Sequence, residues 1–215
     1  MHRMLLAGVA VTLLSCQPKS QAPDDLIVPG VRVGPVARTS TEQALLETLG
    51  NDAVKAEADT GEGPESGLMI YKDDPTRRLF VVWNDEKPVL PSIIYICLGT
   101  LDAQCRWRTA SGIGMRTTLQ ELEKLNGRAF KMVGWGSDVG GNVVSFEAGK
   151  LDQELMSSGR LLVTLDHRYA KEGGYSPLLT REESDAVEGG FILSSHPVLQ
   201  KLNPYVRIMR LEFPR

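Results

Sequence analysis

The chain has 215 residues, of which 42% are hydrophobic and 24% are charged, a composition typical of a folded globular protein. Its formal charge of −3 at pH 7 supplies no basic field for a polyanion, which makes nucleic acid a poor candidate for a partner. Three cysteines are too few for a disulfide-dense mini-protein or a four-thiolate zinc site.

The first residues have the layout of a secretory signal. His2 and Arg3 give a positive start, and an apolar run extends from Met4 to Leu14. This run is too short to cross a bilayer, because a spanning helix needs about 20 apolar residues. We therefore expect residues 1–15 to be a signal peptide that is removed.

The end of the apolar run indicates the type of signal. Leu13-Leu14-Ser15-Cys16 resembles the lipobox of bacterial lipoproteins, and the resemblance implies that Cys16 carries fatty acyl chains such as palmitate. Gln17 in place of an aspartate then favours an anchor in the outer membrane, facing the periplasm. Residues 16–27 are expected to be a polar tether. The alternative is an ordinary signal peptide with an accidental cysteine.

Residues 28–215 are expected to form a single α+β domain, in which a first repeat-like unit covers residues 28–90. In that unit Thr39-Ser40 precedes leucines at helical spacing and a closing glycine. Two extended runs, Leu68–Tyr71 and Leu79–Trp83, then flank a turn that contains aspartate and proline.

A second repeat-like unit, residues 91–150, has the same order of elements. Thr118 and Glu121 have the spacing of a helix-capping box, ahead of another leucine-rich helix that a glycine closes. Extended runs at Ala129–Trp135 and Asn142–Phe146 follow, on either side of a glycine-rich turn. The shared unit is a helix plus a hairpin, so a tandem duplication is possible, and a coincidence of common turn residues is the alternative.

The C-terminal extension, residues 151–215, adds further short elements. The predicted ones are a strand at 161–165, a helix at 180–187, a strand at 191–193, a helix at 197–202 that Ser195 caps, and a strand at 205–213. The apolar alternation of this last strand changes parity near Met209, which indicates either a bulge or burial on both faces. Since consecutive strands are joined by short turns, we expect a mainly antiparallel sheet with short helices packed on it.

Two resemblances extend beyond the lipobox. The run from Val28-Pro29-Gly30 to Gly50, together with Gly134-Trp135-Gly136 and Gly149-Lys150-Leu151, is similar to a group of uncharacterised bacterial exported lipoproteins. The helix-plus-hairpin unit resembles the modules of the outer-membrane assembly lipoprotein BamE and of the tandem β-lactamase inhibitory protein. The first copy lacks the G-M-T start of those modules, and no functional residue is carried over from them.

Cys97 and Cys105 are eight positions apart, with Cys97 at the end of a β-favouring run. In an exported protein this spacing suits a disulfide across a small loop. Two buried free thiols are the alternative. A catalytic thiol is a weaker hypothesis, because neither cysteine has a histidine near it in the sequence.

The sequence contains no nucleophile elbow, phosphate-binding loop, dinucleotide fingerprint or zinc motif, so no metal or cofactor is predicted. The glycine-rich segment 134–142 is the most individual stretch, and its Trp135 and Asp138 are candidates for holding a ligand. Trp107, His167 and Tyr169 are further binding candidates. For all of these residues a purely structural role is the alternative.

We therefore expect a lipid-anchored periplasmic or outer-membrane protein that binds a ligand or interacts with an envelope protein, rather than an enzyme. The membrane partner is the anchor at Cys16. The alternative is an envelope hydrolase whose residues converge only in the fold, with His167, Asp138 and Ser195 as its candidates. A structural envelope protein without a small ligand is the third possibility.

Overall fold

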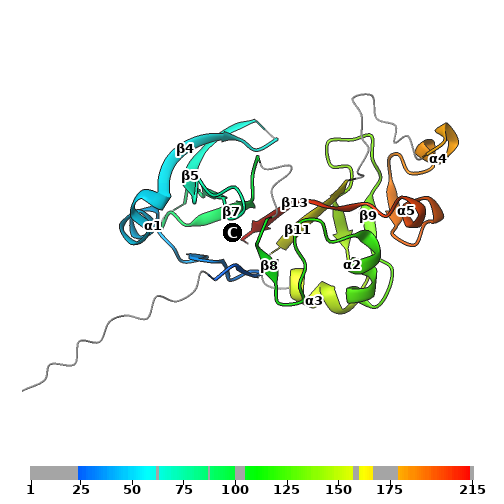
Figure 1. The fold of residues 1–215 in the computed structure, drawn as a ribbon, viewed down its shortest axis with the longest axis horizontal. Coiled ribbons are helices and arrows are strands. Elements are labelled where there is room, and N and C mark those ends of the chain that lie inside the picture. The colour runs from blue at the N-terminus through cyan, green and yellow to red at the C-terminus, as the bar shows by residue number, and fades with distance from the viewer. Residues whose placement is uncertain are drawn as a thin grey trace, which may run out of the picture.

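The computed structural model describes residues 24–61, 63–86, 88–99, 105–156, 160–166 and 179–213. Within these ranges the chain has five α-helices, one 3-10 helix and thirteen strands in sheets whose pairing is almost entirely antiparallel. The predicted α+β class is therefore confirmed. Two groups of elements lie on either side of the long strands β11 (Arg160–Asp166) and β13 (Tyr205–Glu212) (Figure 1).

The largest sheet has six antiparallel strands in the order β11-β13-β7-β6-β5-β4. Its other members are β4 (Ala53–Asp59), β5 (Pro64–Ile70), β6 (Leu79–Trp83) and β7 (Pro91–Ile96). One row of paired residues runs from β5 through β6, β7 and β13 to β11 on a single face of the sheet, and its side chains are fully buried: Leu68, Val81, Ile94, Leu211 and Leu161. This face forms the centre of the hydrophobic core.

A smaller sheet near the start of the described chain has the order β3-β2-β1-β8. Its strands are β1 (Leu26–Val28), β2 (Arg32–Val33), β3 (Val36–Ala37) and β8 (Arg108–Thr109), and β1 and β8 are parallel. The first strand thus begins inside the range expected for the tether. Ahead of it, Asp25 accepts from Arg77 and Arg106, each at 2.7 Å, which fixes the chain to the domain.

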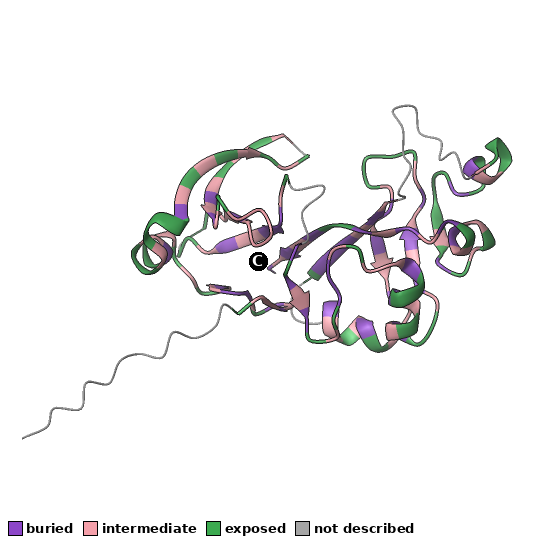
Figure 2. Ribbon diagram, viewed as in Figure 1, coloured by how far each residue is buried: buried purple, intermediate pink, exposed green. Residues whose placement is uncertain are grey.

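The third sheet, β10-β9-β12, lies with most of the helices on the other side of β11 and β13. Its strands are β9 (Lys131–Val133), β10 (Val143–Ser145) and β12 (Phe191–Leu193). The helices are α1 (Glu42–Leu49) and the 3-10 turn η1 (Gly50–Asp52) beside β4, and α2 (Leu119–Asn126), α3 (Lys150–Met156), α4 (Arg181–Asp185) and α5 (Pro197–Leu202) in this second group. Buried residues concentrate on the central strands, whereas α1 and α4 are mostly exposed (Figure 2).

Predicted helix starts are confirmed where both capping partners are local. Thr118 and Glu121 form the reciprocal capping box of α2, and Thr180 and Glu183 form that of α4. The predicted cap of α5 was wrong. His196, not Ser195, caps that helix by accepting from the Val198 amide, because the proline that follows His196 takes the first helical position.

The two repeat-like units differ in the structure. In the second, α2 is followed directly by the β9–β10 hairpin, as predicted. In the first, β4 intervenes between α1 and the β5–β6 hairpin, and the two hairpins belong to different sheets. Neither β4 nor α3 was predicted. From Lys55 onward β4 alternates charged residues with alanine, and Val54 is its one β-branched side chain of the kind that marks a strand.

Cys97 and Cys105 form the predicted disulfide, with 6.1 Å between their Cα atoms. Both residues are almost fully buried. No helix among the described residues has the length and apolar character to span a membrane.

Candidate functional site: a cavity above β7, β11 and β13

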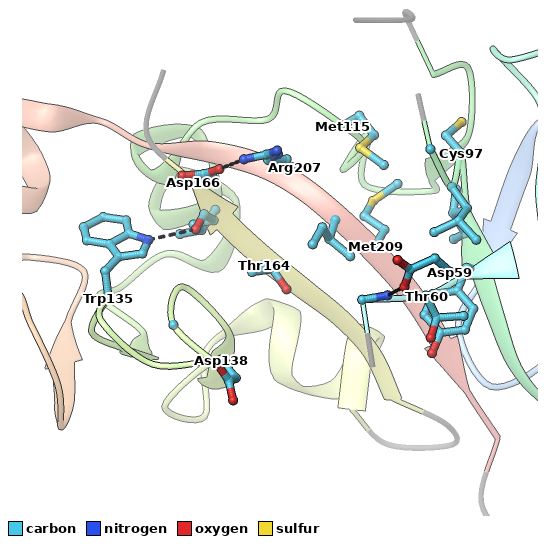
Figure 3. A pocket seen from close by; sticks show the side chains of 18 residues that line it. Asp59, Thr60, Cys97, Met115, Trp135, Asp138, Thr164, Asp166, Arg207 and Met209 are labelled. Atoms are coloured by element: carbon cyan, nitrogen blue, oxygen red, sulfur yellow. Dashed lines mark hydrogen bonds and ion pairs between the residues drawn. The ribbon is translucent and has the colours of Figure 1, made fainter. Parts of the chain in front are cut away.

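A cavity of about 520 Å³ opens where β7, β11 and β13 lie side by side. The tip of the β4–β5 hairpin contributes one wall, and the β9–β10 loop contributes the wall across from it (Figure 3). The lining residues are 59–61, 95–99, 115, 135, 138, 140, 164–166 and 207–209. Small-molecule sites commonly have volumes of about 300–1,000 Å³, so this cavity has the size of a ligand site.

A β-bulge in β13 shapes the floor of the cavity. The strand pairs regularly with β11 up to Ile208, but the next pair joins Val206 to Leu165, which leaves Arg207 as the extra residue. Of the two explanations for the parity change near Met209, the bulge is therefore the one present, and it lies two residues before Met209. Val206 and Met209 are both buried although they are three residues apart, as a bulge between them requires.

The bulge places two different side chains at the cavity. Arg207 forms an ion pair with Asp166 at the end of β11 (Figure 3). The next residue, Ile208, lies on the open side of the sheet and remains 47% exposed. A single irregularity thus gives the floor one charged corner and one apolar surface.

Trp135 forms a wall that is held from behind. Its indole Nε1 donates to the Leu165 carbonyl at 3.3 Å, and its backbone amide donates to the Val187 carbonyl at 3.0 Å. The loop approaches β11 at Gly141, which has a positive φ of 84° and whose carbonyl accepts from the Leu165 amide at 2.8 Å. A Cβ at Gly141 would lie 2.1 Å from the Leu165 oxygen, so only glycine allows this docking.

The rim of the cavity is acidic. Asp59, on the β4–β5 side, accepts from the Gly61 amide at 2.9 Å, and Asp138 lies on the opposite loop. Neither carboxylate forms an ion pair with any cation in the described part of the chain. The described lining carries three carboxylates and one guanidinium, and that guanidinium, of Arg207, is already paired with Asp166. Asp59 and Asp138 therefore leave the rim with a net negative charge.

The structure separates the predicted binding residues. Trp135 and Asp138 both line the cavity. Trp107 does not: it is fully buried, its Nε1 donates to the Arg77 carbonyl at 2.9 Å, and it is a core residue. The prediction of Trp107 as a binding residue was therefore wrong. Cys16, His167 and Tyr169 lie outside the described residues.

The described residues do not assemble the chemistry expected of the alternative hydrolase. Asp138 lines the cavity, but Ser195 lies in the turn before α5 and is not part of the lining. Cys97 reaches the cavity only as one half of a disulfide. In the described ranges no three His, Cys, Asp or Glu side chains are grouped to hold a metal ion.

Comparison of the chain with models of known protein families, with curated proteins and with solved structures found no match. The resemblances to exported lipoproteins and to helix-plus-hairpin modules therefore stay predictions. The case for a function rests on the geometry of the cavity.

Several lining residues had not been singled out from the sequence. Asp59 belongs to the strand that was not predicted, and Arg207 and Ile208 reach the cavity through the bulge. The change of apolar parity in the last strand was the one available signal, and it indicated an irregularity without showing which side chains it would expose. Met115, from the loop before α2, had no signal of its own.

Proposed function

We propose that this protein is a lipid-anchored binding protein of the bacterial envelope, and that its cavity holds the apolar part of a small amphipathic molecule. The observation that supports the binding role is the cavity itself. Its floor leaves the apolar side chain of Ile208 half exposed, and its rim is charged. An apolar interior with a few polar groups at its edge is typical of ligand sites.

The energetic reason lies in the apolar floor. Water against Ile208 and Met115 is released when an apolar group replaces it, and each Å² of apolar surface removed from water contributes about 25 cal/mol. The polar edge would then orient the ligand, because carboxylates and the Arg207–Asp166 pair stay in contact with water at the mouth. A molecule with an apolar body and a polar head satisfies both parts of the site.

The anchor is proposed from the lipobox at Cys16. Asp25, whose carboxylate binds Arg77 and Arg106, follows Cys16 by nine residues. An extended chain covers at most about 3.3–3.6 Å per residue, so the link from an acylated Cys16 to the domain would span no more than about 30 Å. The cavity would therefore work close to a membrane surface, where amphipathic molecules are concentrated.

The binding role is tested by titrating the purified protein with N-phenyl-1-naphthylamine, a neutral apolar fluorophore. Ile208→Ser should weaken binding about fivefold, because a partly exposed isoleucine contributes about 1 kcal/mol of apolar contact. Val31→Ser is the matched control, since Val31 is 50% exposed and lies outside the cavity. Equal affinities of the two variants, or no binding by the unmodified protein, would overturn the proposal.

The anchor is tested separately in the native host. Mass spectrometry of the mature protein should find Cys16 at the N-terminus with acyl chains attached, and Cys16→Ser should release the protein from washed membranes. An unmodified Cys16 in membrane-extracted material would contradict the anchor and leave the cavity titration unaffected.

A further inference from the structure

The strand β12 is an edge of the third sheet, and its outer side has no strand beside it in the described part of the chain. It pairs with β9 alone, in the register Phe191 with Val133, Ile192 with Met132 and Leu193 with Lys131. An edge strand presents unpaired backbone groups to any chain that approaches it.

The direction of those backbone groups follows from the flanking hydrogen bonds. In the same register, the Gly134 amide donates to the Gly190 carbonyl, and the Ser194 amide donates to the Phe130 carbonyl. Hydrogen-bonded pairs alternate along an antiparallel ladder, so Ile192 is the residue between them that bonds to β9. The backbone groups of Phe191 and Leu193 therefore point away from β9.

A second observation supports this assignment. The residue opposite Phe191 is Val133, whose amide donates to Asn142 and whose carbonyl accepts from Gly141. Val133 thus uses both groups on the β10 side and none toward β12. On the outer side of β12, the Leu193 carbonyl accepts from the His196 amide at 2.9 Å, and no described residue bonds to the Phe191 amide, the Phe191 carbonyl or the Leu193 amide.

The side chains of the same two residues are the most unusual feature of this edge. Phe191 is 71% exposed and Leu193 is 46% exposed, and both project from one face because they are two residues apart. By contrast β4, an edge of the six-stranded sheet, carries charged side chains at Lys55, Glu57 and Asp59. Charges on an edge discourage strand addition, and β12 has none.

The charge around β12 indicates what kind of chain fits. The stretch from Arg181 to Leu193, which includes α4 and the turn into β12, has four carboxylates and one arginine. Glu183 is paired with Lys201, whereas Asp185 and Glu188 are exposed and form no ion pair with the described residues. The approach to the strand is therefore negative and favours a basic partner.

We propose that β12 is a docking strand for an extended segment of another protein, with apolar side chains at alternate positions and basic residues at its ends. The segment would add one strand to the sheet β10-β9-β12 through the outward groups of Phe191 and Leu193. A second copy of this chain fits less well. In an antiparallel β12–β12 pair the facing strand would be another uncharged β12, which brings no positive charge to Asp185 and Glu188.

The proposal is tested by amide hydrogen exchange with a synthetic peptide that has valine at alternate positions and two lysines at each end. Saturating peptide should slow exchange at Phe191 and Leu193 about tenfold or more, and leave Ile192, already bonded to β9, unchanged. Unchanged exchange at Phe191 and Leu193 would overturn the proposal. So would slow exchange without peptide that depends on protein concentration, because the occupant would then be a second copy.

Two matched comparisons separate the backbone from the charge. Leu193→Pro and Leu193→Ala both remove the side chain, but only the proline removes the outward amide, and an edge strand tolerates proline there. The proline variant should bind the peptide at least about fivefold more weakly than the alanine variant. If Leu193→Pro fails to fold, a comparison of two peptides with opposite charges at their ends still tests the proposal.

In the second comparison, which tests the charge, the lysine-ended peptide should bind about threefold to tenfold tighter than a glutamate-ended peptide at low salt. The double variant Asp185→Asn/Glu188→Gln should remove that preference. Equal binding of the two peptides by the unmodified protein would contradict a basic partner.

Discussion

Trp107 and Trp135 make similar local contacts, but one ring lies in the core and the other lines the cavity. Each indole Nε1 donates to a backbone carbonyl, of Arg77 in one case and of Leu165 in the other. A glycine with positive φ also lies close to each: Gly34 contacts the Trp107 ring, and Gly141 lies in the loop that follows Trp135. Yet Trp107 is fully buried, whereas Trp135 is partly exposed at a cavity.

The difference comes from what covers the ring. A Cβ at Gly34 would lie 2.4 Å from the Trp107 ring, so the N-terminal turn lies directly against it. The Arg77 guanidinium lies 5.7 Å from the centre of the same ring. Trp135 instead lines the cavity and is partly exposed (Figure 3). A tryptophan near a glycine-rich turn thus indicates neither core nor site until the elements that cover it are known.

The largest expected effect sharpens this comparison. Trp107→Ala should lower the free energy of unfolding by about 3–5 kcal/mol, since it opens a large void in a closed core. Trp135→Ala should cost clearly less, because part of that ring already contacts water. Urea denaturation measures both. Equal losses would contradict the different roles, and Trp107→Phe provides a milder variant if the alanine protein does not fold.

The disulfide connects the two regions, because Cys97 lines the cavity and Cys105 lies two residues before Trp107. Replacing both cysteines by alanine should lower stability by about 2.5 kcal/mol on the loop-closure estimate for a separation of 8. It should also weaken binding of the neutral fluorophore, since the Cys97 wall is no longer held. Reduction of the unmodified protein is the companion measurement, and a protein whose stability ignores reductant would contradict the role of this bond.

The rim carboxylates should have a smaller effect, on the charge preference of the ligand. Asp59 and Asp138 face the mouth without cationic partners among the described residues, so a cationic alkylammonium amphiphile should bind about threefold tighter than its alkyl sulfate counterpart at low salt. Asp59→Asn/Asp138→Asn should remove this preference, and Asp185→Asn, outside the cavity, should not. Calorimetric titration of both amphiphiles makes the comparison, in which a preference for the sulfate would be the contrary result.

The smallest expected effect is the pH-dependent contribution of Asp74, which lies near Trp107, to stability. The Thr76 hydroxyl, its amide and the charges of Arg77 and Arg106 lower the pKa of Asp74 below its ordinary value of 3.8. The ionised form therefore stabilises the fold above that value, and this contribution is lost as the pH falls through the lower pKa of the folded state. The cost of Asp74→Asn in urea denaturation should be largest near about pH 5 and shrink toward about pH 2.5. A loss of stability in Asp74→Asn that grows as the pH falls would contradict the prediction.

Local signals in the sequence predicted local structure well. The capping boxes at Thr118 and Thr180 need partners only three residues away, and both formed. The bond between Cys97 and Cys105 likewise closes a short loop that spacing alone suggests. Segment 134–142 was singled out for its glycines, and its Trp135 and Asp138 line the cavity.

The cavity as a whole could not be predicted from the sequence, because it depends on pairing between strands that lie far apart in the chain. Asp59 reaches it from a strand that is poor in β-branched side chains, with Val54 as its one example. Ile208 reaches it because β13 shifts register against β11, which is set by both strands together. The burial of Trp107 similarly depends on Gly34, which lies between β2 and β3, far earlier in the chain.

The most direct test of the central claim is amide hydrogen exchange with and without a bound neutral amphiphile. Binding in the cavity should slow exchange in the loop around Trp135 and Gly141 and at the bulge around Arg207, while amides around Trp107 stay unchanged. Protection spread evenly over both regions, or found around Trp107 and absent at the bulge, would show that the cavity is not the binding site.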